Sequence, residues 1–303
     1  MRIAASSAQV GDICHNPNYG HCKIQDRPTG VKTGQRRAAD GADNIGTALL
    51  LELPDRAAAD KFSERYMAET HDVLRREIKA LAFDQYGTIV DMQKGLTEAV
   101  TPFLKRKGWD GKPNSFVTWW RRTHFENSMI DALCDRGHTP YRQIGHRAVS
   151  YVMERCGIAV TQEEVSWLVS EIEKLKPFSD VVAALEKLRT SGYKLTILSN
   201  GDRDMLKAAG PHIGFKFDHV ISVQEAGTFK PHWKTYAKAE EIIGYDRSSI
   251  LFVANHAFDC IGAKSYGMRT AFIDRRKRPF GETPHQPDLI VTNFAELAAV
   301  LTR

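Results

Sequence analysis

Short apolar runs alternate with amphipathic helical patterns from about residue 78 onward, and this alternation constrains the fold more than any other feature of the chain. The runs are IKALAFD, YKLTILSN, DHVISV, SILFVAN, RTAFID and DLIVT. Between the later runs lie patterns such as VVAALEKLRTSG and WKTYAKAEEIIG, which end in glycine as helix C-termini commonly do. Strands that alternate with helices predict an α/β fold with a Rossmann-like parallel sheet covered on both faces.

One long interval interrupts the alternation, between IKALAFD and YKLTILSN. It holds helical patterns without a clear strand, of which SFVTWWRRTHFENSMIDAL and TQEEVSWLVSEIEKL are the clearest. We therefore expect an inserted helical cap over residues 95–175, on a core formed by residues 76–94 and 176–303. A cap that follows the first strand directly can roof a site at the end of that strand and exclude water.

Residues 1–75 are predicted to form a flexible N-terminal extension, because most of this segment lacks apolar periodicity. Its last part, IGTALLLELPDRAAADKFSERYMAE, reads as a strand, a Pro-Asp turn and a helix. This pattern resembles half of a small ferredoxin-like dimerisation unit. A leader that only precedes the main domain is the alternative.

Composition excludes several classes of partner. Of the 303 residues 42% are hydrophobic and 26% charged, which is ordinary for a globular protein, and the net charge of +5 is spread along the chain. Because this charge is mild, neither nucleic acid nor an anionic membrane is expected as a partner. No apolar stretch approaches the ~18 residues that span a bilayer, so no membrane helix is expected either. Five scattered cysteines and a start without a signal-peptide core predict a cytoplasmic location. The densest basic run, Arg275-Arg276-Lys277-Arg278, is expected to be a solvated loop.

Several large or sulfur-containing side chains of the helical patterns are expected to be packing residues. Aromatic residues in a small helical domain are more often core than pocket, and free cysteines behave as small hydrophobes. This expectation covers Trp109, Trp119, Trp120, Trp167, Cys134, Cys156 and Cys260.

The first apolar run, ALAFDQYGTIVD, ends in a single carboxylate, Asp84. A carboxylate is costly to bury without partners, so its place at the end of an apolar strand suggests chemistry. The alternative is a turn or helix-capping acid, which the following Gly87-Thr88 would suit.

Other strand ends carry polar residues too. LSNGD brings Ser199 and Asn200, FKPHWKTY brings Lys230 and Tyr236, and LFVANHAFD brings Asn255, His256, Phe258 and Asp259. Active sites of parallel sheets lie at the carboxyl ends of the strands, so these side chains are expected to meet Asp84.

In this order the motifs resemble the haloacid dehalogenase superfamily of hydrolases, and most of all its L-2-haloacid dehalogenase (type II) branch, over roughly residues 78–295. The resemblance implies that Asp84 attacks the C2 carbon of an L-2-haloalkanoic acid, expels halide and forms an ester. Water then hydrolyses the ester and frees the 2-hydroxy acid.

The resemblance also implies roles for other residues. Thr88 orients Asp84, Lys230 keeps it ionised, and Arg121 of the WWRR sequence meets the halide, with Arg122 as a register-shifted rival. The other catalytic residues that it implies are Ser199, Tyr236, His256 and Asp259. The residues expected to bind or line the substrate site are Gln85, Tyr86, Asn200, Asn255 and Phe258.

A phosphatase of the same fold is the first alternative. Such enzymes bind Mg²⁺ through oxygen ligands, usually carboxylates, two residues after the nucleophile and in the last motif. Here those positions hold Tyr86 and Asn255, so no metal and no cofactor are predicted. A catalytically silent binding protein on the same scaffold is the second alternative.

The last motif departs from the S-S-N-x-W-D pattern of the branch. This chain reads A-N-H-A-F-D, so Ala254 lacks a hydroxyl and His256 replaces an amide. His256 either activates the hydrolytic water, since an imidazole can accept a proton near neutral pH, or only hydrogen-bonds the rim of the site. The expected partner is a small-molecule 2-haloacid; the oligomeric state stays open, with a homodimer as one option.

Overall fold

The computed structural model describes residues 68–135 and 137–302. The predicted extension and its strand–turn–helix unit lie outside the described residues up to residue 67, and residues 68–77 are helical. Within the described part, the predicted α/β fold with a parallel sheet is confirmed.

Six parallel strands form one sheet in the order β3-β2-β1-β4-β5-β6. The strands are β1 Ala80–Phe83, β2 Lys194–Ser199, β3 His219–Ser222, β4 Ile250–Ala254, β5 Arg269–Ile273 and β6 Leu289–Val291. All four residues of β1 are buried, with Leu81 and Phe83 in one hydrophobic cluster and Ala80 and Ala82 in another. A strand covered on both faces reads as a continuous apolar run, which explains its sequence.

Helices cover both faces of this sheet. Residues of α7 (Val181–Thr190), α8 (Arg203–Ile213) and α11 (Phe294–Leu301) share the cluster that contains Phe83. Residues of α9 (Trp233–Ile243) and α10 (Ala257–Tyr266) share the cluster of the opposite face. α9 ends at Gly244, which adopts a left-handed conformation that glycine tolerates, as the sequence predicted.

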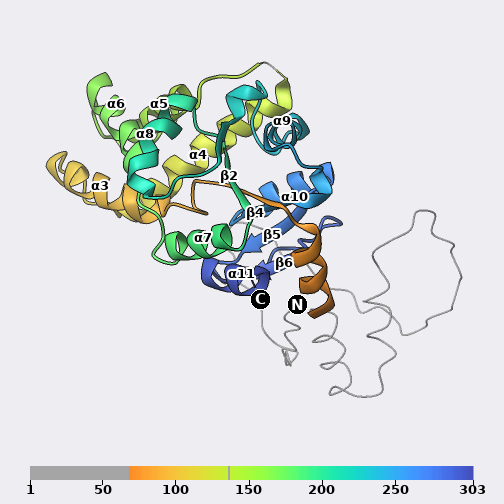
Figure 1. Ribbon diagram of the computed structural model, residues 1–303. Coiled ribbons are helices and arrows are strands. Elements are labelled where there is room, and N and C mark those ends of the chain that lie inside the picture. The colour runs from red at the N-terminus through yellow and green to blue at the C-terminus, as the bar shows by residue number, and fades with distance from the viewer. Residues whose placement is uncertain (1–67, 136, 303) are drawn as a thin grey trace, which may run out of the picture. The chain divides into compact units, whose positions relative to one another are not determined.

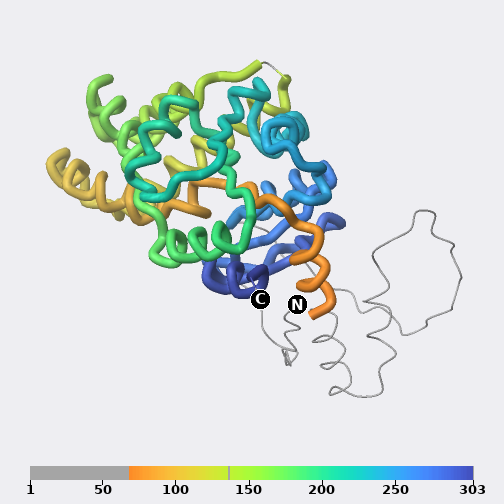
Figure 2. Tube along the Cα trace, viewed as in Figure 1, coloured from red at the N-terminus to blue at the C-terminus, as the bar shows by residue number. Residues whose placement is uncertain are grey.

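The long interval after β1 is helical. It contains α3 (Met92–Arg106), α4 (Pro113–Cys134), α5 (Tyr141–Arg155), α6 (Gln162–Ser170) and the short η1 (Glu171–Lys174). Figures 1 and 2 show the chain leaving β1 into this group of helices and returning through α7 into β2. The exact limits of core and cap, at residues 95 and 175, stay a prediction.

Two expectations about packing in these helices are wrong. Trp120 is fully buried, but Trp119 and Trp167 are exposed, at 41% and 37%. Cys260 is buried whereas Cys134 is exposed. Helical periodicity places residues on a helix but does not say which face meets a neighbour, and α4 presents only part of its surface to the interior.

The basic run after β5 is exposed at Arg276, Lys277 and Arg278, as predicted for a solvated loop, but Arg275 is not solvated. The Arg275 guanidinium lies 3.8 Å from the centre of the Phe178 ring and pairs with the Asp180 carboxylate. It also donates a hydrogen bond of 3.2 Å to the backbone oxygen of Thr88, in the loop after β1. The Arg275 side chain is only 11% exposed, so it ties three segments together.

We predict that Asp180→Ala lowers the free energy of unfolding by about 2 kcal/mol, because it leaves a largely buried guanidinium unpaired. Asp180 also accepts a hydrogen bond of 2.7 Å from the backbone N–H of Phe294, the first residue of α11. Urea denaturation measures the change. Glu241→Ala, which removes the exposed partner of Lys238, is the control and should change the free energy by less than about 0.5 kcal/mol. Equal effects of the two substitutions would contradict a structural role for Arg275.

Candidate active site

The carboxyl ends of β1 and β4 lie side by side at the centre of the sheet. From here the strand order runs to β2 and β3 on one side and to β5 and β6 on the other, so this edge is the topological switch point where α/β proteins bind ligands. Asp84 directly follows β1, and Asn255 and His256 directly follow β4. The predicted convergence of these strand ends is therefore present in the structure.

Asp84 is held through both carboxylate oxygens. Lys230 Nζ donates to Oδ1 over 2.9 Å, and Thr88 Oγ donates to Oδ2 over 2.7 Å. Thr88 Oγ in turn accepts a hydrogen bond of 2.9 Å from the backbone N–H of Asn255. His256 Nδ1 lies 3.6 Å from Asp84 Oδ2. These contacts fix the rotamer of Asp84 while its side chain stays 10% exposed.

Lys230 uses all three of its N–H donors within the site. Besides Asp84 they reach the backbone oxygen of Leu198, at 3.0 Å, and Asp259 Oδ2, at 2.6 Å. The other oxygen of Asp259 accepts a hydrogen bond of 2.7 Å from the Tyr236 hydroxyl. The ammonium group is 1% exposed and stands between two carboxylates, which satisfies the rule that buried charges are paired.

The ion pair with Lys230 determines whether Asp84 is ionised. Burial by itself would raise the pKa of Asp84, but the charge of Lys230, supported by His256 and Thr88, outweighs burial and holds that pKa well below its usual range. Burial would lower the pKa of Lys230, and the charges of Asp259 and Asp84 raise it above its ordinary value instead. At neutral pH the site therefore holds an ionised carboxylate beside an ammonium ion.

The loop after β1 offers backbone donors next to Asp84. Among the described residues, the structure gives no acceptor for the backbone N–H groups of Gln85 and Tyr86, whereas the N–H groups of Asp84 and Gly87 are bonded. The Gln85 side chain points elsewhere and lines a separate cavity of about 750 Å³ beside α8. Only the backbone of Gln85 can therefore take part in the site.

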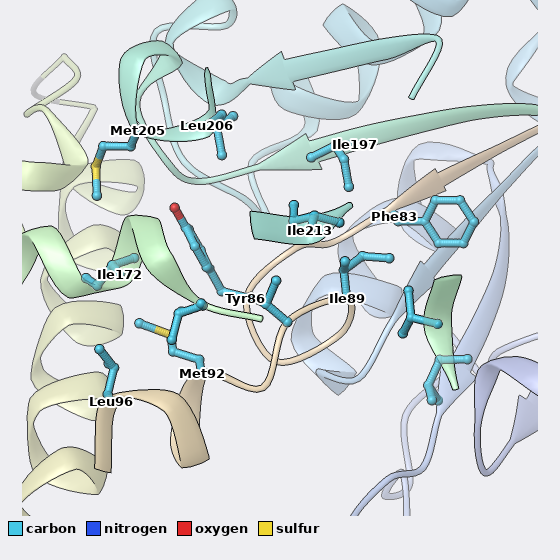
Figure 3. Packing of buried hydrophobic residues seen from close by; sticks show 14 of the residues in the cluster. Phe83, Tyr86, Ile89, Met92, Leu96, Ile172, Ile197, Met205, Leu206 and Ile213 are labelled. Atoms are coloured by element: carbon cyan, nitrogen blue, oxygen red, sulfur yellow. The ribbon is translucent and has the colours of Figure 1, made fainter. Parts of the chain in front are cut away.

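The Tyr86 side chain lies between the loop after β1 and helices α3 and α8. Its ring points into a group that includes Met205 and Leu206 of α8 and Met92 of α3 (Figure 3). A Cβ at Gly201 would lie 2.6 Å from the Tyr86 hydroxyl, so only glycine fits there. Burial raises the pKa of Tyr86 well above its ordinary value, and the side chain stays a neutral phenol.

Arg121, from α4, is the arginine that faces the site. Its Nη1 donates to Gln93 Oε1 over 2.8 Å, and its Nη2 would lie 3.4 Å from a Cβ at Gly87. Burial lowers the pKa of Arg121 to about 10, with the charge of Arg276 acting in the same direction, so it stays cationic at neutral pH. Arg122 instead pairs with Glu126 and its side chain is 64% exposed, which favours Arg121 over its rival.

Two predicted residues have different surroundings from those expected. The Asn255 amide donates to the backbone oxygen of Ile273 over 2.6 Å and so turns toward β5. Ser199 is fully buried, and its hydroxyl accepts from the Gly201 N–H over 3.2 Å.

Asn200 Oδ1 accepts from the backbone N–H of Lys230 over 3.1 Å, which leaves its NH₂ group available. Phe258 lies at the edge of the site, with its ring centre 4.5 Å from that of Phe125 on α4 and 5.7 Å from that of His256.

Sequence reasoning missed residues that join the cap helices to this site. Gln93 holds Arg121, and Tyr141 stacks on the Tyr86 ring with the ring centres 5.6 Å apart. Asp202 accepts hydrogen bonds of 2.8 and 2.9 Å from the first two N–H groups of α5, at Tyr141 and Arg142. Its place in LSNGD was a usable signal, because an acid near a strand end can cap a neighbouring helix. Gln93 and Tyr141 carried no comparable signal.

The described residues contain neither a group of metal-ligating side chains nor a membrane-spanning helix. In residues 68–135 and 137–302, no three or more His, Cys, Asp or Glu side chains are grouped so that they could hold a metal ion. The same part of the chain has no helix that is long and apolar enough to span a membrane.

Comparison with known proteins identifies the family. The family model for haloacid dehalogenase-like hydrolases matches residues 78–267. An (S)-2-haloacid dehalogenase of Pseudomonas sp. (strain YL) is 33% identical over 219 residues, which is 72% of this chain and 91% of that protein.

Solved structures agree with the sequence comparison. The L-2-haloacid dehalogenase RSc1362 superposes with a TM-score of 0.70 at 28% identity, over 75% of this chain and 100% of that one. The L-2-haloacid dehalogenase of Xanthobacter autotrophicus with chloropropionic acid covalently bound gives a TM-score of 0.65 at 28% identity, over 74% of this chain and 98% of that one. The predicted resemblance is confirmed: this chain belongs to the haloacid dehalogenase-like hydrolases, in the L-2-haloacid dehalogenase branch.

Proposed function

We propose that this chain hydrolyses L-2-haloalkanoic acids to 2-hydroxy acids, with Asp84 as the nucleophile. Its relatives are (S)-2-haloacid dehalogenases, and one solved relative carries covalently bound chloropropionic acid. The observation that carries the proposal is the pairing of Asp84 with the buried Lys230 at 2.9 Å, which keeps this carboxylate ionised and oriented.

In the first step an oxygen of Asp84 attacks C2 of the substrate from the side opposite the halogen. The new bond joins this oxygen to C2, and the electron pair of the carbon–halogen bond leaves with the halide. Arg121 stabilises the departing anion from the cap side, where one of its N–H groups faces Gly87 beside the nucleophile. A halide needs no proton, so the site requires no general acid.

The substrate carboxylate is bound on the core side. The unbonded backbone N–H groups of Gln85 and Tyr86, directly after Asp84, and the free NH₂ of Asn200 are donors available to it. Ser199 has a supporting role, because its buried hydroxyl orders the turn at Gly201.

In the second step water attacks the carbonyl carbon of the Asp84 ester and the bond from that carbon to the ester oxygen breaks. The 2-hydroxy acid leaves with the proton that the base takes from the water. His256 is the candidate base, since its Nδ1 lies 3.6 Å from the carboxylate while a quarter of its side chain is exposed. Asp259 and Tyr236 hold Lys230 in place, and the hydrolysis returns Asp84 to its carboxylate form.

The surroundings of the nucleophile favour this function over a magnesium-dependent phosphatase. Lys230 Nζ lies within 2.9 Å of Asp84 and 2.6 Å of Asp259, so an ammonium already pairs with both carboxylates. Tyr86 is a neutral phenol turned toward α8, and the Asn255 side chain is turned toward Ile273. The described residues thus offer few of the free oxygen ligands that Mg²⁺ prefers. A cytoplasmic location and a homodimer stay predictions.

Halide release from L-2-chloropropionate in the presence of EDTA tests the proposed function. We expect chelator to leave the rate unchanged and Asp84→Asn to abolish turnover. In ¹⁸O-labelled water, a single turnover should place the label in Asp84, which mass spectrometry of the peptide detects. Loss of activity with EDTA, or label in the product alone, would contradict an ester on Asp84.

Removal of the Lys230 charge should change the pH dependence in a defined direction. The pKa of Asp84 is held low by Lys230, and burial alone would raise it, so Lys230→Met should leave Asp84 largely protonated at neutral pH. We expect kcat/KM at pH 7 to fall roughly a hundredfold or more, and to recover partly as pH rises. Lys238→Met on the exposed side of α9 is the control. A loss that is equal at every pH would contradict this role of Lys230.

His256→Ala should slow hydrolysis of the ester more than its formation. We expect a burst of halide followed by slow release, with alkylated Asp84 accumulating in the mass spectrum of the intact protein. His212→Ala, in the last turn of α8, is the matched control and should show no accumulation. Slow ester formation in His256→Ala, without accumulation, would show that His256 only orients Asp84.

A further inference from the structure

The ring of Tyr141 joins the helix that bears Arg121 to the loop that bears Asp84. His124 follows Arg121 by one helical turn on α4, and residues three apart share a helix face. The Tyr141 ring stacks on the His124 ring with the centres 3.9 Å apart, and lies parallel to the Tyr86 ring, at 7°, with the centres 5.6 Å apart. Tyr141 therefore lies between the proposed halide-binding arginine and the nucleophile loop.

The backbone of Tyr141 is fixed on two sides. Its N–H donates to Asp202 Oδ1 over 2.8 Å, and its carbonyl oxygen lies 3.0 Å from His124 Nε2. Burial lowers the pKa of His124 to about 4, so at neutral pH the imidazole is neutral and Nε2 donates to that carbonyl. Because these contacts involve only the backbone, they position the ring and leave its hydroxyl available.

The hydroxyl of Tyr141 is a neutral donor in an enclosed place. Tyr141 is 7% exposed, and its hydrogen bonds with other described residues involve its backbone alone. Burial, with the nearby charge of Asp84, raises the pKa of Tyr141 against the opposing charge of Arg121, so the phenol keeps its proton. Because no described residue accepts a hydrogen bond from it, this hydroxyl is available to an acceptor on a bound ligand.

The substrate carboxylate and the departing halide are both anionic hydrogen-bond acceptors, and they occupy different places. The carboxylate belongs on the core side, at the backbone of Gln85 and Tyr86. Displacement from behind puts the halogen on the side of C2 opposite Asp84, toward the cap. Tyr141 begins α5 in the cap, and the charges of both Asp84 and Arg121 act on its phenol, so this side chain stands on the side where the halide leaves.

We infer that Tyr141 donates a hydrogen bond to the departing halide beside Arg121, and that this donor assists the departure of fluoride most. The inference rests on the proposed function. As the bond from Asp84 to C2 forms, the carbon–halogen bond breaks and its electron pair leaves with the halide, while the phenol proton stays on Tyr141. Fluoride is the smallest halide and the strongest hydrogen-bond acceptor among them, so it gains most from a second donor, and bromide gains least.

Comparison of halogens in Tyr141→Phe tests this role, because phenylalanine keeps the stacked ring and removes only the hydroxyl. The measurement is kcat/KM for fluoroacetate, chloroacetate and bromoacetate, which reports the first irreversible step, formation of the ester. We expect a fall of roughly ten- to a hundredfold for fluoroacetate and of less than about threefold for bromoacetate. Tyr151→Phe, at an exposed position of the same helix, should leave the ratio unchanged.

Other outcomes overturn the inference in distinguishable ways. An equal fall for all three halogens would mean that Tyr141 acts through packing, and no fall would mean that it does not meet the halide. Bromide release without fluoride release by the unmodified protein would overturn the assistance to fluoride and leave the proposed function intact. Absence of any halide release would sink the proposed function itself.

Discussion

A buried ammonium ion between two carboxylates is the interaction on which the rest of the site depends. Lys230 contacts Asp84, Asp259 and the backbone oxygen of Leu198, which belong to the segments after β1, at the start of α10 and in β2. A charge this deeply buried is tolerated only when its partners are fixed at hydrogen-bonding distance, because removal of one partner leaves an uncompensated charge. The order of the parallel strands holds these partners in place, because it brings the ends of β2, β1 and β4 side by side.

Hydrogen bonds and an ion pair likewise hold the loop after β1. Thr88 bonds Asp84 through its hydroxyl, while its backbone oxygen accepts from Arg275, which in turn pairs with Asp180. Asp180 accepts from the first N–H of α11. A continuous chain of polar contacts thus runs from the nucleophile to the start of α11, so residues that stabilise the fold also preorganise the site.

Much of the core could be predicted from local pattern because β1 and β4 are apolar runs of strand length with a polar residue directly after them. The position of Asp84 at such an end, and of His256 at another, followed from the chain alone. The contributions of the cap did not: Tyr141 and Gln93 act through contacts between helices whose relative orientation no local pattern encodes. The sequence predicts a solvated Arg275 because its aromatic partners, Phe178 and Phe294, lie far from it in the sequence and no local pattern indicates them. Helical periodicity failed for Trp119 and Cys134 for a related reason, since it does not tell a packed face from an open one.

In the proposed mechanism this arrangement separates the tasks of core and cap. A carboxylate that an internal lysine keeps ionised can attack carbon, but neither Lys230, whose donors are all engaged, nor the neutral phenol of Tyr86 is placed to give a proton to a leaving alcohol. In the attack on carbon, therefore, only groups that depart as stable anions suit the site. Stabilisation of that anion has to come from outside the core, and Arg121 and Tyr141 both belong to the helices inserted after β1. The core therefore selects the type of bond that breaks, whereas the cap decides which halide can leave.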